Sequence, residues 1–362
     1  MSFYLKEGEI LWPTAEGTYD VRNKLPTGTY TVGAHPARGF YLKPISDFDI
    51  TGKIYGKTTK QAERILSTFA ARPNSTGVLL SGEKGSGKTM LAKLVSQKAA
   101  MDGISTLVIN TPFTGDAFNT FIQSINEPCI IVFDEFEKVF DEKEQEATLT
   151  LLDGVYPTKK LFVLTCNDRY RVNSHMTNRP GRIFYFLEFK GLDVAFIEEY
   201  CRDRLDDKKH IQQICRLSML YASFNFDMLK ALVEEMNRYN ETPNEALEML
   251  NAKPFSGEDS THYDAKIIID GLEVAPSRIN SPSMRGNPVS RGNYSFWVDE
   301  LPKDGEDVDD VNQFEVEIRP DNLKKIDPEK GTFTYYIEGE TNIVVVLTRE
   351  NAKAAYDWRS AF

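Results

Sequence analysis

The stretch from Gly82 to Thr89, GEKGSGKT, constrains this chain more than any other part of its sequence. It fits the pattern G-x-x-x-x-G-K-[ST] of a phosphate-binding loop, and it lies between a short apolar run at 78–80 and a helical pattern. Glycines allow the tight turn in which successive N–H groups face an anion, and the helix N-terminus adds partial positive charge. We therefore predict a strand, a phosphate-binding loop and a helix. A glycine-rich turn with a surface lysine is the alternative.

The pattern also assigns roles to individual residues of the loop. Lys88 is expected to reach the β and γ phosphates of a nucleotide, and the Thr89 hydroxyl is expected to bind Mg²⁺. The predicted ligands are therefore ATP and Mg²⁺. The other predicted contacts in the loop are Gly82, Gly85, Ser86 and Gly87.

Short apolar runs alternate with helical patterns from about residue 52 to residue 190, which is typical of a parallel α/β sheet. The predicted strands are 78–81, 106–110, 129–133, 161–166 and 183–187, and the predicted helices are 57–71, 88–101, 115–125 and 143–153. We predict four parts, namely a β-rich N-terminal module (1–51), the α/β domain (52–190), a helical region (191–253) and a β-rich C-terminal module (254–362).

Charge and composition narrow the possible compartments and partners. The formal net charge of −11 gives no overall basic footprint for nucleic acid, although a local basic patch is still possible. No apolar run approaches the ~18 residues that span a bilayer, and the first residues do not have the pattern of a secretory signal. The four cysteines have no metal-ligand spacing. We expect free buried thiols, a cytoplasmic location and no membrane insertion.

Two acidic residues follow the apolar strand predicted at 129–133. Asp134 at the strand end is expected to bind Mg²⁺, and Glu135 is expected to polarise the attacking water as a general base. A core strand followed by an ordinary acidic turn is the alternative.

Further polar residues follow the strand predicted at 161–166. Asn167 is placed to orient a water molecule, because ligands of such sheets sit at the carboxyl ends of the strands. Arg179 and Arg182 flank a Pro-Gly turn, and a guanidinium group delivered across a subunit boundary can stabilise transition-state charge. The alternatives are a turn asparagine and a basic surface turn.

Together these elements resemble the AAA+ ATPases, and more narrowly the clade whose second region of homology ends in R-P-G-R. That clade includes membrane AAA proteases and many protein unfoldases. The resemblance covers about residues 52 to 250 and implies that the helical region is a lid. Lys88 and Thr89 match Walker A, Asp134 and Glu135 match Walker B, Asn167 matches sensor 1, Arg179 and Arg182 match the arginine fingers, and Ile54, Tyr55 and Gly56 match the segment against adenine.

The chain departs from the family pattern in the loop 168–176, which lacks the usual Leu-Asp-x-Ala-Leu. The lid helix has Lys230 and no arginine near sensor 2, where this clade usually lacks one, so we assign no sensor 2 residue. Phe113 occupies about the place of a pore-loop aromatic that grips polypeptide, and a core or loop aromatic is the alternative. The sequence contains no H-E-x-x-H, so it does not predict a fused zinc protease.

The resemblance implies a Mg-dependent ATP hydrolase that forms a homo-oligomeric ring, with a hexamer as the family expectation, and that remodels or unfolds proteins. A nucleic-acid-remodelling or loading ATPase is the first alternative. It is suggested by a combination of positive charge and aromatic rings that is used for single strands, formed by Arg285, Arg291, Tyr294, Phe296 and Trp297. These aromatics can equally belong to the core of a β module. An assembly scaffold that is switched by ATP is the second alternative.

Overall fold

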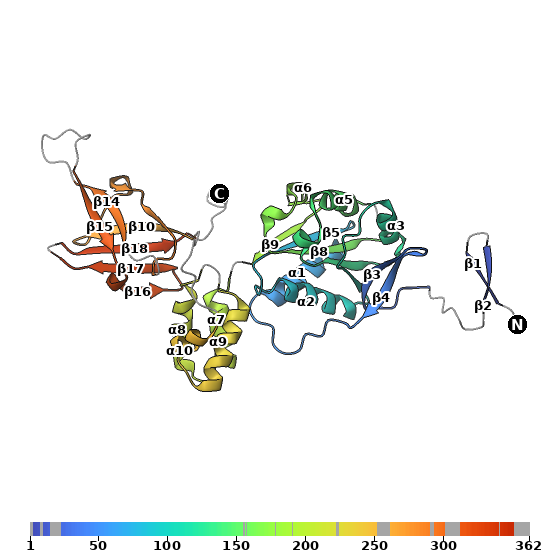
Figure 1. Cartoon of the computed structure of the whole chain (residues 1–362), viewed down its shortest axis with the longest axis horizontal. Coiled ribbons are helices and arrows are strands. Elements are labelled where there is room, and N and C mark those ends of the chain that lie inside the picture. Colours follow the sequence, from blue (N-terminus) through green and yellow to red (C-terminus); the bar gives the residue numbers. More distant parts are fainter. Residues whose placement is uncertain are drawn as a thin grey trace. The chain divides into compact units, whose positions relative to one another are not determined.

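The computed structural model describes residues 3–7, 10–14, 23–154, 156, 158–177, 179–189, 191–221, 224–251, 261–289, 293–300, 312–339 and 341–350. The chain divides into two compact units (Figure 1). The first comprises residues 1–82 and 87–189, and the second comprises residues 83–86 and 190–362.

A seven-stranded sheet with the order β4-β3-β6-β7-β8-β5-β9 forms the centre of the first unit. All neighbouring strands are parallel except β3 and β4. The strands are β3 (Thr29–His35), β4 (Gly39–Ile45), β5 (Thr76–Gly82), β6 (Ser105–Ile109), β7 (Cys129–Phe133), β8 (Lys160–Cys166) and β9 (Tyr185–Phe189). The predicted parallel α/β fold is confirmed.

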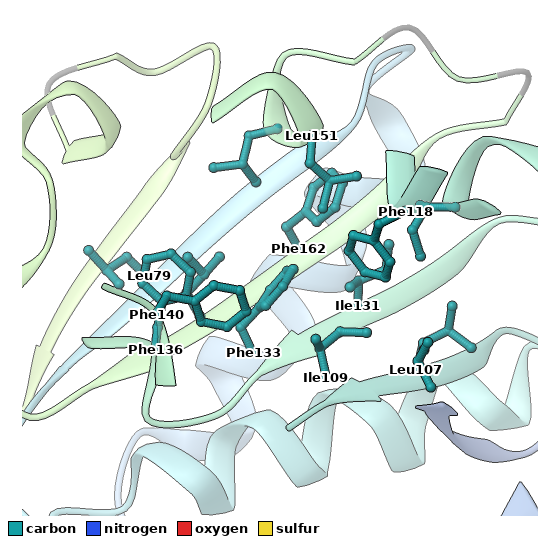
Figure 2. Close-up of a cluster of buried hydrophobic side chains, with 14 of the residues drawn as sticks. Leu79, Leu107, Ile109, Phe118, Ile131, Phe133, Phe136, Phe140, Leu151 and Phe162 are labelled. Atoms are coloured by element: carbon teal, nitrogen blue, oxygen red, sulfur yellow. The ribbon is translucent and has the colours of Figure 1, made fainter. Parts of the chain in front are cut away.

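Helices cover both faces of this sheet. On one face, α1 (Thr58–Ala71) and α2 (Lys88–Met101) pack against Val78 and Leu80 of β5. On the other face, α3 (Asp116–Ser124), α4 (Phe136–Val139) and α5 (Glu142–Leu152) pack against a core that includes Leu79 of the same strand (Figure 2). Because successive strand residues point to opposite faces, a strand covered on both sides has to be apolar throughout. This explains the near-continuous apolar runs of the sequence.

Strands β3 and β4 extend the sheet beyond β6. Residues 29–31 of β3 pair in parallel with residues 106–108 of β6. The ring of Phe40 on β4 lies 5.1 Å from the ring of Phe113 and 5.3 Å from that of Phe118, between centroids. The predicted N-terminal module is therefore β-rich, as expected, and these two of its strands continue the α/β sheet. Its boundary at residue 51 stays a prediction.

Two further strands precede this sheet. β1 (Phe3–Glu7) and β2 (Ile10–Thr14) form an antiparallel two-stranded sheet of their own, with Phe3 paired to Thr14.

The helical part of the second unit contains α7 (Val194–Arg204), α8 (Ile211–Ser218), α9 (Phe226–Tyr239) and α10 (Pro243–Met249). Side chains cap the N-termini of α7, α9 and α10, where the backbone N–H groups lack helical partners. The Asn225 side chain accepts a hydrogen bond from the Met228 N–H, and Thr242 forms a capping box with Glu245. These local signals explain where α9 and α10 begin, within the region that was predicted to be helical.

The second unit ends in two antiparallel sheets that share one core. The larger has the order β11-β10-β18-β17-β16, with β13 also paired to β10, and the smaller has the order β12-β14-β15. Their strands are β10 (His262–Ile269), β11 (Leu272–Glu273), β12 (Ile279–Asn280), β13 (Ser283–Arg285), β14 (Tyr294–Asp299), β15 (Gln313–Ile318), β16 (Leu323–Asp327), β17 (Thr332–Ile337) and β18 (Ile343–Arg349). The predicted β-rich C-terminal module is confirmed.

Two general expectations can be compared with these elements. In the part of the chain that the structure describes, no helix is long and apolar enough to cross a membrane. The four cysteines are buried and form no disulfide, as predicted.

Candidate functional site

The predicted phosphate loop joins β5 to α2 through a backbone that requires glycine. Gly82, Gly85 and Gly87 have φ angles of 148°, 73° and 100°. A Cβ atom on Gly82 would lie 2.3 Å from the backbone oxygen of Phe189, so no other residue fits there. Among the described residues, the buried Ser86 hydroxyl has no hydrogen-bond partner. The tight glycine backbone, this unpaired hydroxyl and the N-terminus of α2 fit a phosphate group.

Lys88 is the first residue of α2 and is only 7% exposed. Its Nζ donates to the Gly82 carbonyl oxygen at 2.5 Å and to Asn167 Oδ1 at 3.2 Å. Burial lowers the pKa of Lys88, and the neighbouring thiol and carboxylates oppose this shift only in part. The ammonium is therefore desolvated and held at the loop, where it can meet a phosphate.

The two acids after β7 are organised by a residue that the sequence analysis does not identify. The Thr165 hydroxyl donates to Asp134 Oδ1 at 2.6 Å and accepts from the Glu135 backbone N–H at 2.9 Å. Glu135 has a left-handed backbone, with φ 49° and ψ 46°, and its carboxylate forms an ion pair with Lys138 at 2.5 Å. Left-handed backbone outside glycine is uncommon and concentrates at functional sites.

Buried aromatic rings hold this acidic turn from both sides. Phe133 precedes the two acids and Phe136 follows them, and both are fully buried. The ring of Phe140 lies 4.8 Å from that of Phe136 and 5.5 Å from that of Phe133, between centroids. Figure 2 shows these three rings gathered beside the strands. The rings anchor the turn in the core while the carboxylates stay partly exposed.

Asn167 directly follows β8 and is held by a second residue that the sequence analysis does not identify. Glu137 Oε1 accepts hydrogen bonds from the Asn167 backbone N–H at 3.0 Å and from its Nδ2 at 2.9 Å. In the sequence, Thr165 is only a threonine inside the apolar run 161–166, and Glu137 is only a further acid close to Asp134 and Glu135. Neither position indicates which residue it will contact in the fold.

The structure thus brings Lys88, Asp134, Glu135 and Asn167 to the carboxyl edge of β5, β7 and β8. Thr89 is the exposed second residue of α2. A threonine hydroxyl and a carboxylate suit Mg²⁺, which prefers oxygen ligands. The described residues contain no group of three or more His, Cys, Asp or Glu side chains that could hold a metal by themselves.

The predicted arginine fingers differ in their surroundings. Arg179 is exposed, whereas the Arg182 side chain is only 11% exposed. Arg182 Nε donates to both carboxylate oxygens of Asp153, at 2.8 and 2.9 Å, and Nη1 donates to the His175 carbonyl oxygen at 2.9 Å. The hydrogen bond from Arg182 holds the pKa of Asp153 below its ordinary value. Arg182 therefore ties the turn to the end of α5 within one chain.

The predicted adenine segment lies against the core of the first unit. Tyr55 is buried, and Ile54 packs against the cluster that includes Leu91 of α2. Gly56 has a φ of 66°. The segment is thus fixed to the helix that begins at Lys88.

Phe113 is half-buried and packs against the core of the first unit with Phe40 and Phe118. This contact supports the interpretation of Phe113 as a core or loop aromatic.

The basic and aromatic cluster of the C-terminal module is divided between two sheets. Arg285 lies on β13 in the larger sheet, and Phe296 on β14 belongs to the core with 1% exposure. Trp297 is 45% exposed and pairs with Glu315, so the two share the outer face of the smaller sheet. Arg291 lies outside the described residues. The exposed ring therefore has a carboxylate beside it, which disfavours a nucleic-acid backbone.

Comparison with known proteins gives a match over the same region. Residues 78–190 match the model of the family described as ATPase family associated with various cellular activities (AAA). Peroxisomal ATPase PEX1 of Homo sapiens is 28% identical over 182 residues, which cover 45% of this chain and 14% of that protein. Protein mac-1 of Caenorhabditis elegans is 29% identical over 137 residues, 32% of this chain and 17% of that protein. Nuclear valosin-containing protein-like of Mus musculus is 28% identical over 125 residues, 30% of this chain and 14% of that protein.

Each alignment spans less than a fifth of the relative's own length, with 17% the largest share of these three. The matched segment contains the phosphate loop, both acids, Asn167 and the arginine turn. Over this region the chain is homologous to these AAA proteins, and residues 78–190 match an AAA ATPase domain.

Proposed function

We propose that this chain is the subunit of a ring-shaped ATPase that uses Mg-dependent ATP hydrolysis to remodel or unfold proteins or protein complexes. The observation that carries the proposal is the cluster of Lys88, Asp134, Glu135 and Asn167 at one edge of the sheet. Hydrogen bonds and buried rings hold its members in place. A fixed arrangement of cation, acids and amide is what electrostatic catalysis of phosphoryl transfer requires.

Each residue has a distinct role in this proposal. Lys88 and the loop N–H groups bind the phosphates, while Thr89 and Asp134 provide oxygen ligands for Mg²⁺, which neutralises phosphate charge when bound. Glu135 accepts the proton of the attacking water, and Asn167 orients that water. Ile54, Tyr55 and Gly56 are proposed to contact the base.

Ring formation would give the exposed arginine of the turn a role in the neighbouring subunit. Arg179 is exposed, so a neighbouring subunit can receive it, and head-to-tail contacts of this kind close into rings. Arg182 holds the turn against Asp153 in this chain, which supports a role in setting the position of Arg179. We retain the hexamer expected from the resemblance to the R-P-G-R clade.

Proteins are the substrates that the available observations favour. The net charge of −11 and the carboxylate beside Trp297 do not suit a polyanion. The four cysteines are buried and form no disulfides, which suits a reducing compartment. We therefore propose that the protein is located in the cytoplasm.

Glu135→Gln provides the test of this function. We expect the variant to bind ATP with nearly wild-type affinity and to hydrolyse it at least ~100-fold more slowly, because the general base is lost. Glu142→Gln removes an exposed carboxylate at the start of α5 and is the matched control. A normal turnover rate for Glu135→Gln would exclude the assigned base.

ATPase assays of the wild-type protein can identify the substrate class. Stimulation of ATP hydrolysis by an unfolded polypeptide supports protein remodelling. Stimulation by DNA or RNA that weakens steeply with salt would instead favour a nucleic-acid motor. Ring assembly that depends on ATP, with stimulation by neither ligand, would favour an assembly switch.

A further inference from the structure

Glu137 lies two residues after the proposed base and has no role in the pattern from which the site was predicted. It belongs to α4 and is only 5% exposed. Its Oε1 accepts hydrogen bonds from both the backbone N–H and the Nδ2 group of Asn167, at 3.0 and 2.9 Å. One buried oxygen therefore holds both the backbone after β8 and the side-chain amide.

The neighbouring charges determine which way the Asn167 amide faces. A carboxylate only accepts hydrogen bonds, and an ammonium group only donates them. Nδ2 therefore faces Glu137, and Oδ1 faces Lys88, whose Nζ lies 3.2 Å away. The amide links a cation to an anion, and a flipped amide would lose both interactions.

The second oxygen of Glu137, Oε2, is buried without a hydrogen-bond partner among the described residues. An unpaired buried oxygen destabilises a fold, and the two hydrogen bonds from Asn167 to Oε1 offset that cost. The hydrogen bonds found for this carboxylate in the described part of the chain thus come from Asn167.

We propose that Glu137 is a positioning residue for ATP hydrolysis that fixes the orientation of Asn167 relative to Lys88. This inference rests on the proposed function of the same site. Nδ2 has two hydrogens and gives one to Glu137, so the oriented amide can donate the other to the attacking water or the γ-phosphate. Glu137 acts through Asn167 and itself contacts neither the attacking water nor the γ-phosphate.

A double-mutant cycle tests this proposal. Glu137→Leu removes both acceptor oxygens, Glu137→Gln keeps one, and Asn167→Ala removes the amide. We expect Glu137→Leu to lower kcat by about 10- to 100-fold, the effect typical of lost orienting partners, while the Kd for ATP changes little. Glu137→Gln should recover most of this loss. In the Asn167→Ala background, Glu137→Leu should cause no further loss, because its effect passes through the amide.

Two results would overturn the proposal. One is a wild-type kcat for Glu137→Leu, and the other is an equal loss of kcat with and without Asn167. If Glu137→Leu does not fold, as judged by thermal unfolding and ATP binding, the cycle is run with Glu137→Gln, whose smaller loss should also vanish in the Asn167→Ala background. A wild-type chain without ATPase activity, or a fully active Glu135→Gln, would overturn the function itself instead.

Discussion

Thr165 offers the most direct test of how the fold positions the acidic turn. Its hydroxyl contacts both acids, donating to Asp134 Oδ1 and accepting from the Glu135 N–H. Thr165→Val keeps the branched shape suited to β8 and removes only the hydroxyl. The variant therefore isolates two hydrogen bonds from the packing of the strand.

The magnitude follows from these two bonds. A hydrogen bond to a charged acceptor contributes about 1.5–3 kcal/mol, and a buried N–H left without a partner costs about 1–3 kcal/mol. Because Asp134 and Glu135 are partly exposed, water can replace part of each interaction. We expect Thr165→Val to lower the free energy of unfolding by about 2–4 kcal/mol and kcat by about 10- to 100-fold.

Thr76 provides a matched control in the same sheet. Like Thr165 it is 1% exposed, but among the described residues its hydroxyl has no hydrogen-bond partner. Thr76→Val should leave kcat unchanged and should leave the stability unchanged or raise it by about 1 kcal/mol, because an unpaired polar group leaves the core. Urea unfolding and steady-state ATPase assays measure both quantities. Equal shifts in stability and equal kcat for the two variants would refute the reasoning.

Four further predictions follow from the site and its surroundings. Lys88→Ala should abolish ATP binding in a fluorescent-nucleotide assay, because the buried cation that meets the phosphates is lost. Arg179→Ala should retain ATP binding yet lower turnover by about 10³-fold or more, and a normal rate would exclude the finger. Asp153→Asn should reduce the difference between the free energies of unfolding at pH 7 and at pH 3, measured with urea. Arg182 lowers the pKa of Asp153 in the folded protein, so the Asp153 carboxylate stabilises the fold above about pH 4. This stabilisation is lost as the pH falls through the folded-state pKa. The native thiols should resist iodoacetamide at pH 8 and react with it in urea, and mass spectrometry measures the modification. Burial raises the pKa of Cys166, raises that of Cys129 and Cys215 to about 11, and raises that of Cys201 to about 12, so few reactive thiolates form in the folded protein.

Local patterns were sufficient to predict most elements of the α/β sheet. The helix predicted at 88–101 and the strand predicted at 129–133 have those same bounds in the structure. The glycine-rich loop before the helix and the two acids after the apolar strand mark these ends. The residues proposed for phosphate binding and water activation could be predicted for the same reason, because they lie next to one another in short contiguous motifs.

Contacts between distant segments could not be predicted in this way. The pairing of β3 with β6 joins residues 29–31 to residues 106–108, and no local pattern in either segment specifies the other. Thr165 and Asp134 are likewise partners in space, and so are Asp153 and Arg182. The sequence indicated the residues that we propose to contact the nucleotide. It did not indicate the residues that hold them, because only folding brings the second group into contact with the first.

The backbone of Glu135 shows that core packing also positions the acidic turn. Its left-handed backbone costs about 1–3 kcal/mol and would not persist in an isolated turn. Burial of Phe133 and Phe136 on either side stabilises the fold by about 1.5–3 kcal/mol for each ring, which outweighs that cost. Core packing, rather than the preference of the turn, therefore holds the proposed base in place before any nucleotide arrives. The position of the carboxylate is then set by the same rings that stabilise the sheet, so catalysis and folding depend on one set of contacts.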